Sequence, residues 1–502
     1  MAKSSCCLNC CTVTSLLLLL IAIGLLCSFE AIYYAVINQT GFIKKTTTYY
    51  ESWRYVPKSY DQYMNFYFFN VTNQDDIMNG AKPNVTQVGP VSYIEIQQKY
   101  DIEFLNDSHL VRYYENRTFI YSPETSDISE DEVLTLVNFP FWIVYQTGFA
   151  TNPAFEFLLA IEFNEHTPQN NKLFQPIYQV APKDIIWGYT DPLLVLMKSL
   201  VPSVVPLTEF GLFMGKNATH NGQFVVDTGI HNQNKRRGKI STWKHSDMLT
   251  IWANHESNMI NGTDGETYRT KMEGVDQVYA FNTDVCRSFY LDIHDTEYKI
   301  DGIKTKKYSV PASGFASGKN SSYSKGFCTP NANFCQLDGV VNITNCEEIP
   351  YVALGGNFDM NIFMSLPNFL FADESYINGI NGMNPVEEDH EIFAKIHQPT
   401  GLVVSGSQRA QINYLIQRNV KSMYPYYMSE FTKDAIMFPL FWIDEKADAN
   451  HSLRTLIKGL VAFHEIGWIV LGALAILFLI IIIICISYIF CCHKKDPKDY
   501  YI

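Results

Sequence analysis

The chain has 502 residues, of which 47% are hydrophobic and 18% charged, and its 38 basic and 51 acidic side chains give a net charge of −13. The length exceeds the roughly 100 to 200 residues of one typical domain, the acidic balance without a long basic stripe argues against a nucleic-acid partner, and the apolar content excludes collagen-like and disordered chains. Two runs without charged residues, 12–29 and 466–490, match the about 20 apolar residues that a helix needs to cross a bilayer. We predict a membrane span at each run, which excludes a purely cytosolic protein.

The first apolar run continues past Glu30 to Ile37 and is not followed by a small-x-small cleavage pattern. We therefore interpret residues 12–37 as an uncleaved transmembrane helix rather than a signal peptide, with residues 1–11 as a cytosolic tail. Glu30 would lie near the outer end of this span, where its carboxylate can reach interfacial water.

Cysteines gather on the cytosolic side of the two predicted spans. Juxtamembrane cytosolic cysteines are typical acceptors for palmitate. The candidates are Cys6, Cys7, Cys10, Cys11, Cys491 and Cys492. The spacing of Cys7 and Cys10 also fits a metal knuckle, but no second pair or histidine cluster accompanies it on the same tail. We therefore predict acylation and no metal site. Ala2 excludes myristoylation, which needs glycine at that position.

After the first span, the sequence predicts strands and then a helical segment. Residues 66–71, 89–96 and 111–121 are rich in aromatic and β-branched residues and predict strands. Ser129 and Glu132 form a capping-box pattern before Val133, Leu136 and Val137, which predicts a helix start.

An unusually apolar segment follows at residues 139–163, with a break near Asn152 and Pro153 that predicts two short helices. Its apolar residues are spread around the helix, so we expect some of this surface to be exposed unless partners cover it. Strand-like, turn-rich sequence resumes from about residue 222. This order predicts one α+β domain over residues 38–463, with mostly antiparallel strands outside the helical cluster.

Glycosylation signals indicate which side of the membrane this domain faces. We predict N-glycans at Asn70, Asn84, Asn106, Asn116, Asn217, Asn261, Asn320, Asn342 and Asn450. Asn38 also begins a signal but lies too close to the predicted membrane. The domain therefore faces the lumen or the cell exterior. Residues 464–490 form the second span, and the lysines of residues 491–502 fit a cytosolic tail.

Four cysteines fall in this domain, at positions 286, 328, 335 and 346. In an oxidising compartment we expect two disulfides, and four cysteines allow three pairings.

Catalytic patterns are weak throughout the chain. His464 and Glu465 do not extend to an HExxH zinc motif, because Trp468 occupies the place of the second histidine. The glycine-containing segments 211–216 and 314–319 each fall one residue short of a phosphate loop. A two-span ligand-gated channel and a two-span ecto-nucleotidase share the predicted topology, but polar pore-lining positions are scarce in the second span and nucleotide-binding glycine motifs are missing. We therefore predict a protein that is not an enzyme.

Six segments, in order along the chain, resemble the class B scavenger receptors, the family of the fatty-acid translocase, the high-density-lipoprotein receptor and the type two lysosomal integral membrane protein. They are IWGYTDP at 186–192, NGTD at 261–264, DVCRS at 284–288, GFAS at 314–317, SLPNFL at 365–370 and NPVEEDH at 384–390. The resemblance runs through nearly the whole domain, and the two-span topology agrees with it.

This resemblance implies a fold and a mode of action. It implies a lumenal or extracellular antiparallel β-barrel core, a helical bundle at the membrane-distal apex over about residues 128–200, and a hydrophobic tunnel toward the bilayer. Such a tunnel would carry a lipid across the aqueous gap. Burial in the tunnel would stabilise the lipid chain by about 0.8 kcal/mol for each methylene kept from water. The implied ligands are fatty acids, sterols, phospholipids or lipoproteins, with other polyanionic and protein ligands. No cofactor or catalytic residue is implied.

The resemblance also implies particular residues. It pairs Cys286 with Cys346 and Cys328 with Cys335. It makes Lys172 a candidate for the lipid entrance, where a cation would bind a lipid carboxylate. Candidate contacts for a partner at the apex are Phe141, Trp142, Phe155, Leu158 and Leu159.

Two functions within the family fit this sequence. The first is a lipid-conducting scavenger receptor, and the second is a trafficking receptor that carries a lysosomal hydrolase by its apical helices. The tail at residues 499–502 is one residue short of a tyrosine-based sorting signal. We therefore expect a plasma-membrane or lysosomal and endosomal location, with both termini cytosolic.

Overall fold

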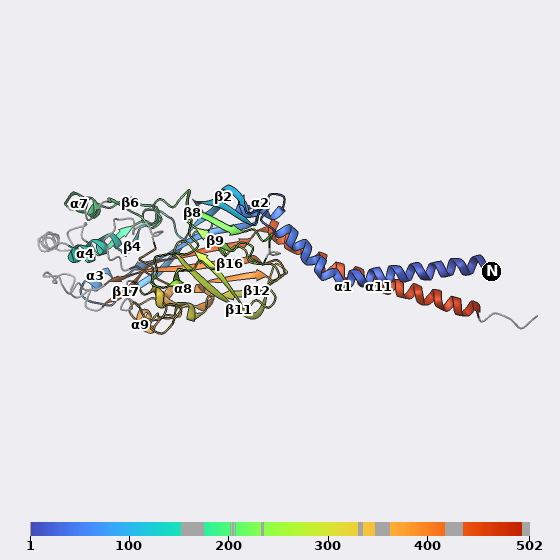
Figure 1. Cartoon of the computed structure of the whole chain (residues 1–502). Helices are drawn as coiled ribbons and strands as arrows, with labels where there is room; N and C mark the ends of the chain where they lie inside the picture. Colours follow the sequence, from blue (N-terminus) through green and yellow to red (C-terminus); the bar gives the residue numbers. More distant parts are fainter. Residues whose placement is uncertain are drawn as a thin grey trace, which may run out of the picture.

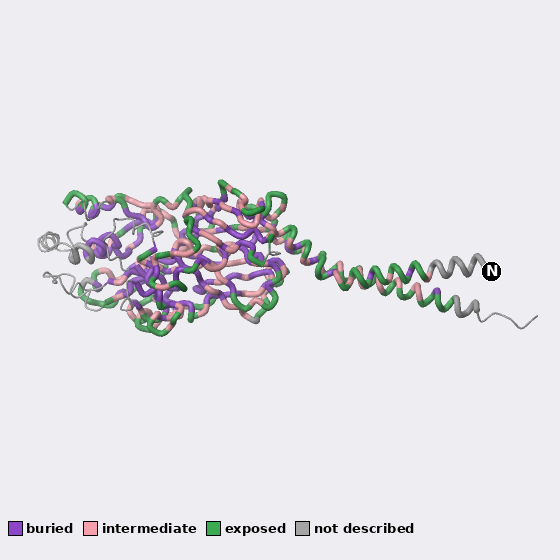
Figure 2. Tube along the Cα trace, viewed as in Figure 1, coloured by how far each residue is buried: buried purple, intermediate pink, exposed green. Residues whose placement is uncertain are grey.

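In the computed structural model, two long helices run side by side away from a large β-rich domain, and the N-terminus lies at their far end (Figure 1). The structure describes residues 2–151, 175–200, 202, 205, 207–231, 235–329, 335–346, 362–416 and 435–493. The two long helices are α1 (Ala2–Gly41) and α11 (His451–His493). Both are long and apolar enough to cross a membrane, within Thr12–Gly41 and His451–Tyr488. Their outward faces are mostly exposed, as lipid-facing surfaces would be, whereas buried residues fill the interior of the domain (Figure 2).

Aromatic and polar contacts join the two long helices. Gly467 lets the Phe29 ring approach the backbone of α11, since a Cβ there would lie 2.1 Å from a ring atom. The Nε2 atom of His464 lies 2.9 Å from an Oε2 of Glu30, and Trp468 donates to the same histidine at 3.2 Å. Glu30 thus has a side-chain partner in α11 in addition to its place near the outer end of the span. Outside the helix pair, Asn38 accepts a hydrogen bond from Thr270 at 2.7 Å.

The domain is built on one antiparallel sheet, thirteen-stranded in the part of the chain described. Its main path runs in the order β10 (Gln277–Asn282), β11 (Arg287–Ile300), β12 (Ile303–Ser309), β15 (Phe393–His397), β16 (Leu402–Ile416), β17 (Ile436–Ala449), β1 (Tyr60–Val71), β2 (Val85–Leu105), β3 (Leu110–Tyr121), β8 (Thr219–Asp227) and β9 (Ile240–Trp243). Beside β16 lie β14 (Ile362–Ser365) and then β13 (Val340–Asn342). The predicted strands at 66–71, 89–96 and 111–121 are confirmed within β1, β2 and β3.

The two end strands of this path, β9 and β10, are bridged by a loop rather than paired. Ile240 donates to the carbonyl of Gly262 at 2.9 Å, and Thr263 bonds to Tyr279 and Phe281 of β10. Gly262 has φ +87°, and a Cβ there would lie 1.9 Å from the Tyr279 carbonyl oxygen, so the bridge requires glycine. A fully closed barrel, as expected from the resemblance, is therefore not found among the strands described.

Smaller elements surround the sheet. Two short hairpins pair β4 (Leu134–Val137) with β5 (Ile177–Val180) and β6 (Tyr189–Thr190) with β7 (Glu209–Phe210). The shorter α-helices are α2 (Thr48–Arg54), α3 (Gln74–Met78), α4 (Phe139–Thr151), α6 (Pro182–Trp187), α7 (Pro192–Leu200), α8 (His255–Asn258), α9 (Glu374–Ile377) and α10 (Glu387–His390). Single 3₁₀ turns are η1 (Val56–Lys58), η3 (Ala312–Phe315), η4 (Lys325–Phe327) and η7 (Pro367–Phe369). Helices α4 and α7 lie at the end of the domain away from the long helices (Figure 1).

The helix start predicted at Val133 is wrong. Leu134 to Val137 form the strand β4, which pairs with β5. Ser129 and Glu132 form a turn, in which the Glu132 amide donates to the Ser129 carbonyl at 3.1 Å. The spacing of Val133, Leu136 and Val137 fits both a helix and a short strand, and pairing with the distant β5 decides in favour of the strand.

Candidate functional site

A cavity of about 230 Å³ lies inside the large sheet. Along β17 and β1 the lining residues alternate, as period-2 strand geometry requires. On β17 the lining residues are Phe441, Ile443, Glu445 and Ala447, which extend over roughly 20 Å at about 3.3 Å per residue. Small residues leave space in the wall, since Ala447 pairs with Gly406 of β16 and both line the cavity.

Much of the wall is apolar. Further apolar lining comes from Met64, Phe281, Phe289, Leu291, Met364 and Ile412. A mostly apolar wall with a few polar side chains at defined points is the usual composition of a small-molecule site.

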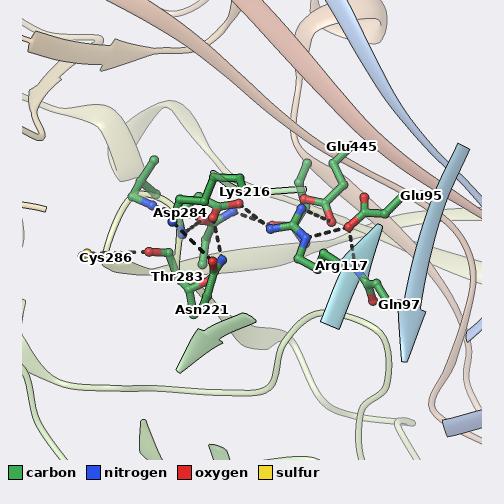
Figure 3. A network of polar contacts seen from close by, with 12 residues as sticks. Glu95, Gln97, Arg117, Lys216, Asn221, Thr283, Asp284, Cys286 and Glu445 are labelled. Atoms are coloured by element: carbon green, nitrogen blue, oxygen red, sulfur yellow. Dashed lines mark hydrogen bonds and ion pairs between the residues drawn. The ribbon is translucent and has the colours of Figure 1, made fainter. Parts of the chain in front are cut away.

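The polar part of the cavity centres on Arg117 of β3 (Figure 3). Its Nε lies 2.6 Å from Glu95, its Nη1 lies 2.8 Å from Asp284, and its Nη2 lies 3.4 Å from Glu445. Asn221 donates to the other oxygen of Asp284 at 2.9 Å. One guanidinium therefore joins three carboxylates from β2, β17 and the turn between β10 and β11.

The carboxylates of this cluster differ in proton affinity. Burial alone would raise the pKa of Asp284, but the adjacent Arg117 outweighs it, and the pKa of Asp284 is lowered. Burial, reinforced by the negative charge of Glu95, raises the pKa of Glu445 to about 8 against the opposing effect of Arg117. Glu445 is therefore largely protonated at neutral pH and can act as a hydrogen-bond donor or acceptor.

A second buried cluster lies on the same side of β2. The ammonium of Lys99, whose side chain is fully buried, pairs with Glu115 and lies 3.5 Å from Glu266. It also lies 5.5 Å from the ring centres of Trp53 and Tyr113. Burial raises the pKa of Glu266 well above its ordinary value, although Lys99 opposes the shift. Glu115 and Glu266 line the cavity as well.

The raised pKa of Glu445 predicts that the protein loses stability as pH rises from 6.5 to 8. In this range the folded chain keeps a proton that the unfolded chain has released, so unfolding is favoured by on the order of 2 kcal/mol over the interval. Glu266 and Asp264, whose pKa values are also raised by burial, act in the same direction.

Urea unfolding of the full chain at several pH values tests this prediction. We expect the Glu445→Gln variant to show a flatter profile, whereas Glu103→Gln, which changes an exposed carboxylate on β2, should keep the wild-type slope. Equal wild-type stability at pH 6.5 and pH 8 would contradict the assignment.

The residues proposed for ligand contact fall into two groups. Lys172, Phe155, Leu158 and Leu159 lie outside the residues that the structure describes. Phe141 and Trp142 lie in the first turn of α4 and are 1% and 0% exposed. Asn138 caps this helix by accepting from the Phe141 amide at 3.0 Å, and the Trp142 indole donates to the Pro176 carbonyl at 3.1 Å. Contrary to expectation, these two side chains pack in the core and offer no surface to a partner.

Both expected disulfides are present in the structure, Cys286–Cys346 and Cys328–Cys335. The side chains of the palmitoylation candidates, Cys6, Cys7, Cys10, Cys11, Cys491 and Cys492, lie outside the described part. Among the described residues there is no group of three or more His, Cys, Asp or Glu that could hold a metal ion.

The glycosylation candidates differ in accessibility. Asn84, Asn106, Asn217 and Asn320 are exposed, and Asn70, Asn116, Asn261 and Asn450 are partly buried. Asn342 is only 8% exposed, and its Nδ2 donates to the Thr329 carbonyl at 3.4 Å. The structure therefore disfavours a glycan at Asn342, because the amide nitrogen that would carry it is buried and hydrogen-bonded.

The polar cluster around Arg117 was not found from the sequence. A signal for it is nevertheless present in β2, where Glu95, Gln97 and Lys99 point inward and are buried, while Ile94 is 39% exposed. The usual alternation of apolar residues inside and polar residues outside is thus reversed over this stretch. A strand whose inward-facing residues are polar is what a cavity with a polar wall requires.

Comparison with known proteins identifies a family and relatives that this chain resembles. A profile of the CD36 family matches residues 12–489. Lysosome membrane protein 2 of Homo sapiens is 30% identical over 464 residues, which cover 91% of this chain and 89% of that protein. Scavenger receptor class B member 1 of Mus musculus is 29% identical over 448 residues, which cover 86% of this chain and 80% of that protein.

Proposed function

Because the chain belongs to the CD36 family, a membrane protein with two terminal spans, we propose that it acts as a class B scavenger-type receptor whose internal cavity binds a lipid. The observation that carries this proposal is the cavity itself, which is mostly apolar and extends along the strands of the sheet. Burying an acyl chain there gains about 0.8 kcal/mol per methylene. Binding and release suffice for such a function, so no catalytic step is proposed.

We further propose that lipid passes through this cavity toward the membrane. Val56 of η1 and Tyr60 at the start of β1 line the cavity, and both are close in sequence to the end of α1 at Gly41. The ligands proposed for delivery are fatty acids, sterols, phospholipids or lipoprotein lipid, with polyanionic and protein ligands bound elsewhere on the domain. The domain would face the exterior or the lumen of lysosomes and endosomes, with both termini cytosolic.

A trafficking receptor for a lysosomal hydrolase remains the second candidate. The match to lysosome membrane protein 2 over 91% of the chain supports a lysosomal role. The apex residues proposed for such a partner are now Phe155, Leu158 and Leu159, since Phe141 and Trp142 are buried.

Filling the cavity tests the lipid function. We expect Ala447→Trp to abolish saturable lipid binding by the full chain in nanodiscs, because the indole would occupy the space left by Ala447 and Gly406. The matched control is Ala81→Trp, since Ala81 is an exposed loop residue. The measurement is retention of radiolabelled lipid after exchange. Unchanged binding by a folded Ala447→Trp variant would contradict the cavity as the lipid site.

A further inference from the structure

The outer face of β2 and β3 carries aromatic side chains that the core does not bury. Since Lys99 of β2 is buried on the inner face, the next residue, Tyr100, points outward, and it is 37% exposed. Tyr114 of β3 lies directly opposite Tyr100 in the sheet. The two rings stack with their centres 5.8 Å apart. Aromatic surface left open on a sheet face is a candidate binding site.

A third ring joins this pair from the neighbouring strand β8. The ring centre of His220 lies 4.9 Å from that of Tyr114 and 6.4 Å from that of Tyr100. Hydrogen bonds hold the rings, because Gln223 donates to the Tyr114 hydroxyl at 3.1 Å and the Gly222 amide donates to Nδ1 of His220 at 3.0 Å. With Nδ1 as the acceptor, Nε2 of the neutral imidazole carries the proton and can donate to a ligand.

A β-bulge gives His220 its place on the outer face. Asn221 and Gly222 of β8 together lie opposite Glu115 of β3. Gly222 has φ +106°, a conformation that favours glycine. The extra residue brings His220 into the pair with Asn116, on the face opposite to the lipid cavity.

These rings border an open hollow of about 520 Å³. Its lining residues are Gln98, Tyr100, Asn116, Ala218, Thr219 and His220. The C–H face of a sugar ring packs against the electron-rich face of an aromatic ring, and its hydroxyl and acetamide groups bond to amide and hydroxyl side chains. An aromatic hollow with an amide and a hydroxyl in its wall therefore suits a saccharide.

The hollow also contains a residue that can carry a saccharide. Asn116, Arg117 and Thr118 form a glycosylation signal. The Arg117 side chain lines the lipid cavity, so Asn116 and Thr118 point to the outer face. The Asn116 amide forms no side-chain hydrogen bond with the described residues, in contrast to the buried Nδ2 of Asn342, which donates to Thr329. Asn116 is therefore ready for attachment at the point where the hollow opens.

We propose that Asn116 carries an N-glycan whose first N-acetylglucosamine ring packs in this hollow, on the ring of Tyr100 and beside His220. Attachment joins Nδ2 of Asn116 to C1 of the sugar of a lipid-linked oligosaccharide, the amide gives up one proton, and the lipid diphosphate leaves. The polar groups of the sugar lie against Gln98 and Thr219. The seated sugar then links β2, β3 and β8 and stabilises this part of the sheet. The proposal depends on a lumenal or extracellular domain and not on the lipid cavity.

Release of the glycan from the folded chain tests whether the sugar is packed. The full chain is produced in mammalian cells and placed in nanodiscs, and glycopeptide mass spectrometry gives the occupancy of Asn116 and its rate of release by a peptide N-glycosidase. We expect release from the wild type to be about three- to tenfold slower than from Tyr100→Ser, the worth of one aromatic contact. After denaturation the two rates should be equal. His220→Ala is a second variant with the same expected direction.

The matched control is Tyr298→Ser, which removes a partly exposed tyrosine of β11 that does not line the hollow and should keep the wild-type rate. Thermal unfolding establishes that each variant is folded. An unglycosylated Asn116, or equally fast release from the wild type and from both hollow variants, would overturn the proposal.

A double-mutant cycle tests the stabilisation. Asn116→Gln keeps an amide but removes the glycan, and we expect it to raise the unfolding equilibrium constant about three- to tenfold, as measured by urea unfolding. In the Tyr100→Ser background the same change should have no effect, because the sugar has lost its ring contact. Asn320→Gln, at an exposed turn residue, should leave stability unchanged. Equal effects of Asn116→Gln in both backgrounds would show that the sugar does not contact Tyr100.

Discussion

Replacing Arg117 with methionine is expected to lower the free energy of unfolding by about 3 to 5 kcal/mol. The change leaves Glu95, Asp284 and Glu445 without the guanidinium that joins them. Glu95 is 1% exposed and cannot recover the lost interaction from water. Removing one partner from a buried ion cluster is costly because the remaining charges stay buried.

The matched control lies on the same strand. Arg112 pairs with Glu103, and the two side chains are 39% and 56% exposed. Arg112→Met should therefore cost less than about 1 kcal/mol. Both variants are compared by urea unfolding of the full chain, followed by tryptophan fluorescence. A loss below about 1 kcal/mol for Arg117→Met would show that the cluster contributes no more than a surface pair.

Removing the Cys286–Cys346 disulfide is the second change with a large expected effect. This bridge joins residues 60 apart in the sequence, whereas Cys328–Cys335 joins residues 7 apart. Chain-entropy scaling gives about 4 kcal/mol for the long loop and about 2 kcal/mol for the short one. We therefore expect the double serine variant at Cys286 and Cys346 to be the less stable of the two.

Each double variant removes both thiols of one bridge, so that no free cysteine can form a new pair. Unfolding of the two variants and the wild type under identical conditions gives the comparison. Equal losses, or a larger loss for the short loop, would mean that local packing around the bridges outweighs the entropy of loop closure.

The sequence predicted best where local pattern and burial agree. The segments at 66–71, 89–96 and 111–121 fall within β1, β2 and β3, because alternating aromatic and β-branched residues pack against neighbouring strands. A helix was predicted to start at Val133, but Leu134–Val137 form a strand, since their pairing with β5 is a contact over a long sequence distance. Spacing alone cannot report such a contact.

Helix α4 shows a second limit of prediction from the sequence pattern. Apolar residues on all sides of α4 suggested exposed surface for a partner, but Phe141 and Trp142 are buried. A helix that is apolar all round is generally one buried in a core. Here α4 packs near α7 at the end of the domain, and the Trp142 indole finds its acceptor in Pro176, which is distant in sequence.

The disulfide pairing was predicted from the family resemblance, because the number of cysteines alone left three pairings open. The candidate site could be predicted neither from the sequence pattern nor from the family resemblance. Its charged residues, Glu95, Arg117, Asp284 and Glu445, come from separate strands and a turn, and only the folded sheet brings them together. The reversed pattern of Ile94 and Glu95 in β2 is a local trace of the polar cluster.

Photochemical cross-linking tests the central claim, that lipid binds inside the sheet, most directly. A tetradecanol analogue with a diazirine on its chain is bound to the full chain in nanodiscs and irradiated, and the modified peptides are identified by mass spectrometry. We predict modification of the β17 wall, at Phe441 and Ile443, and its loss in Ala447→Trp. Modification confined to α1 and α11, or unchanged by Ala447→Trp, would contradict a lipid site in the cavity.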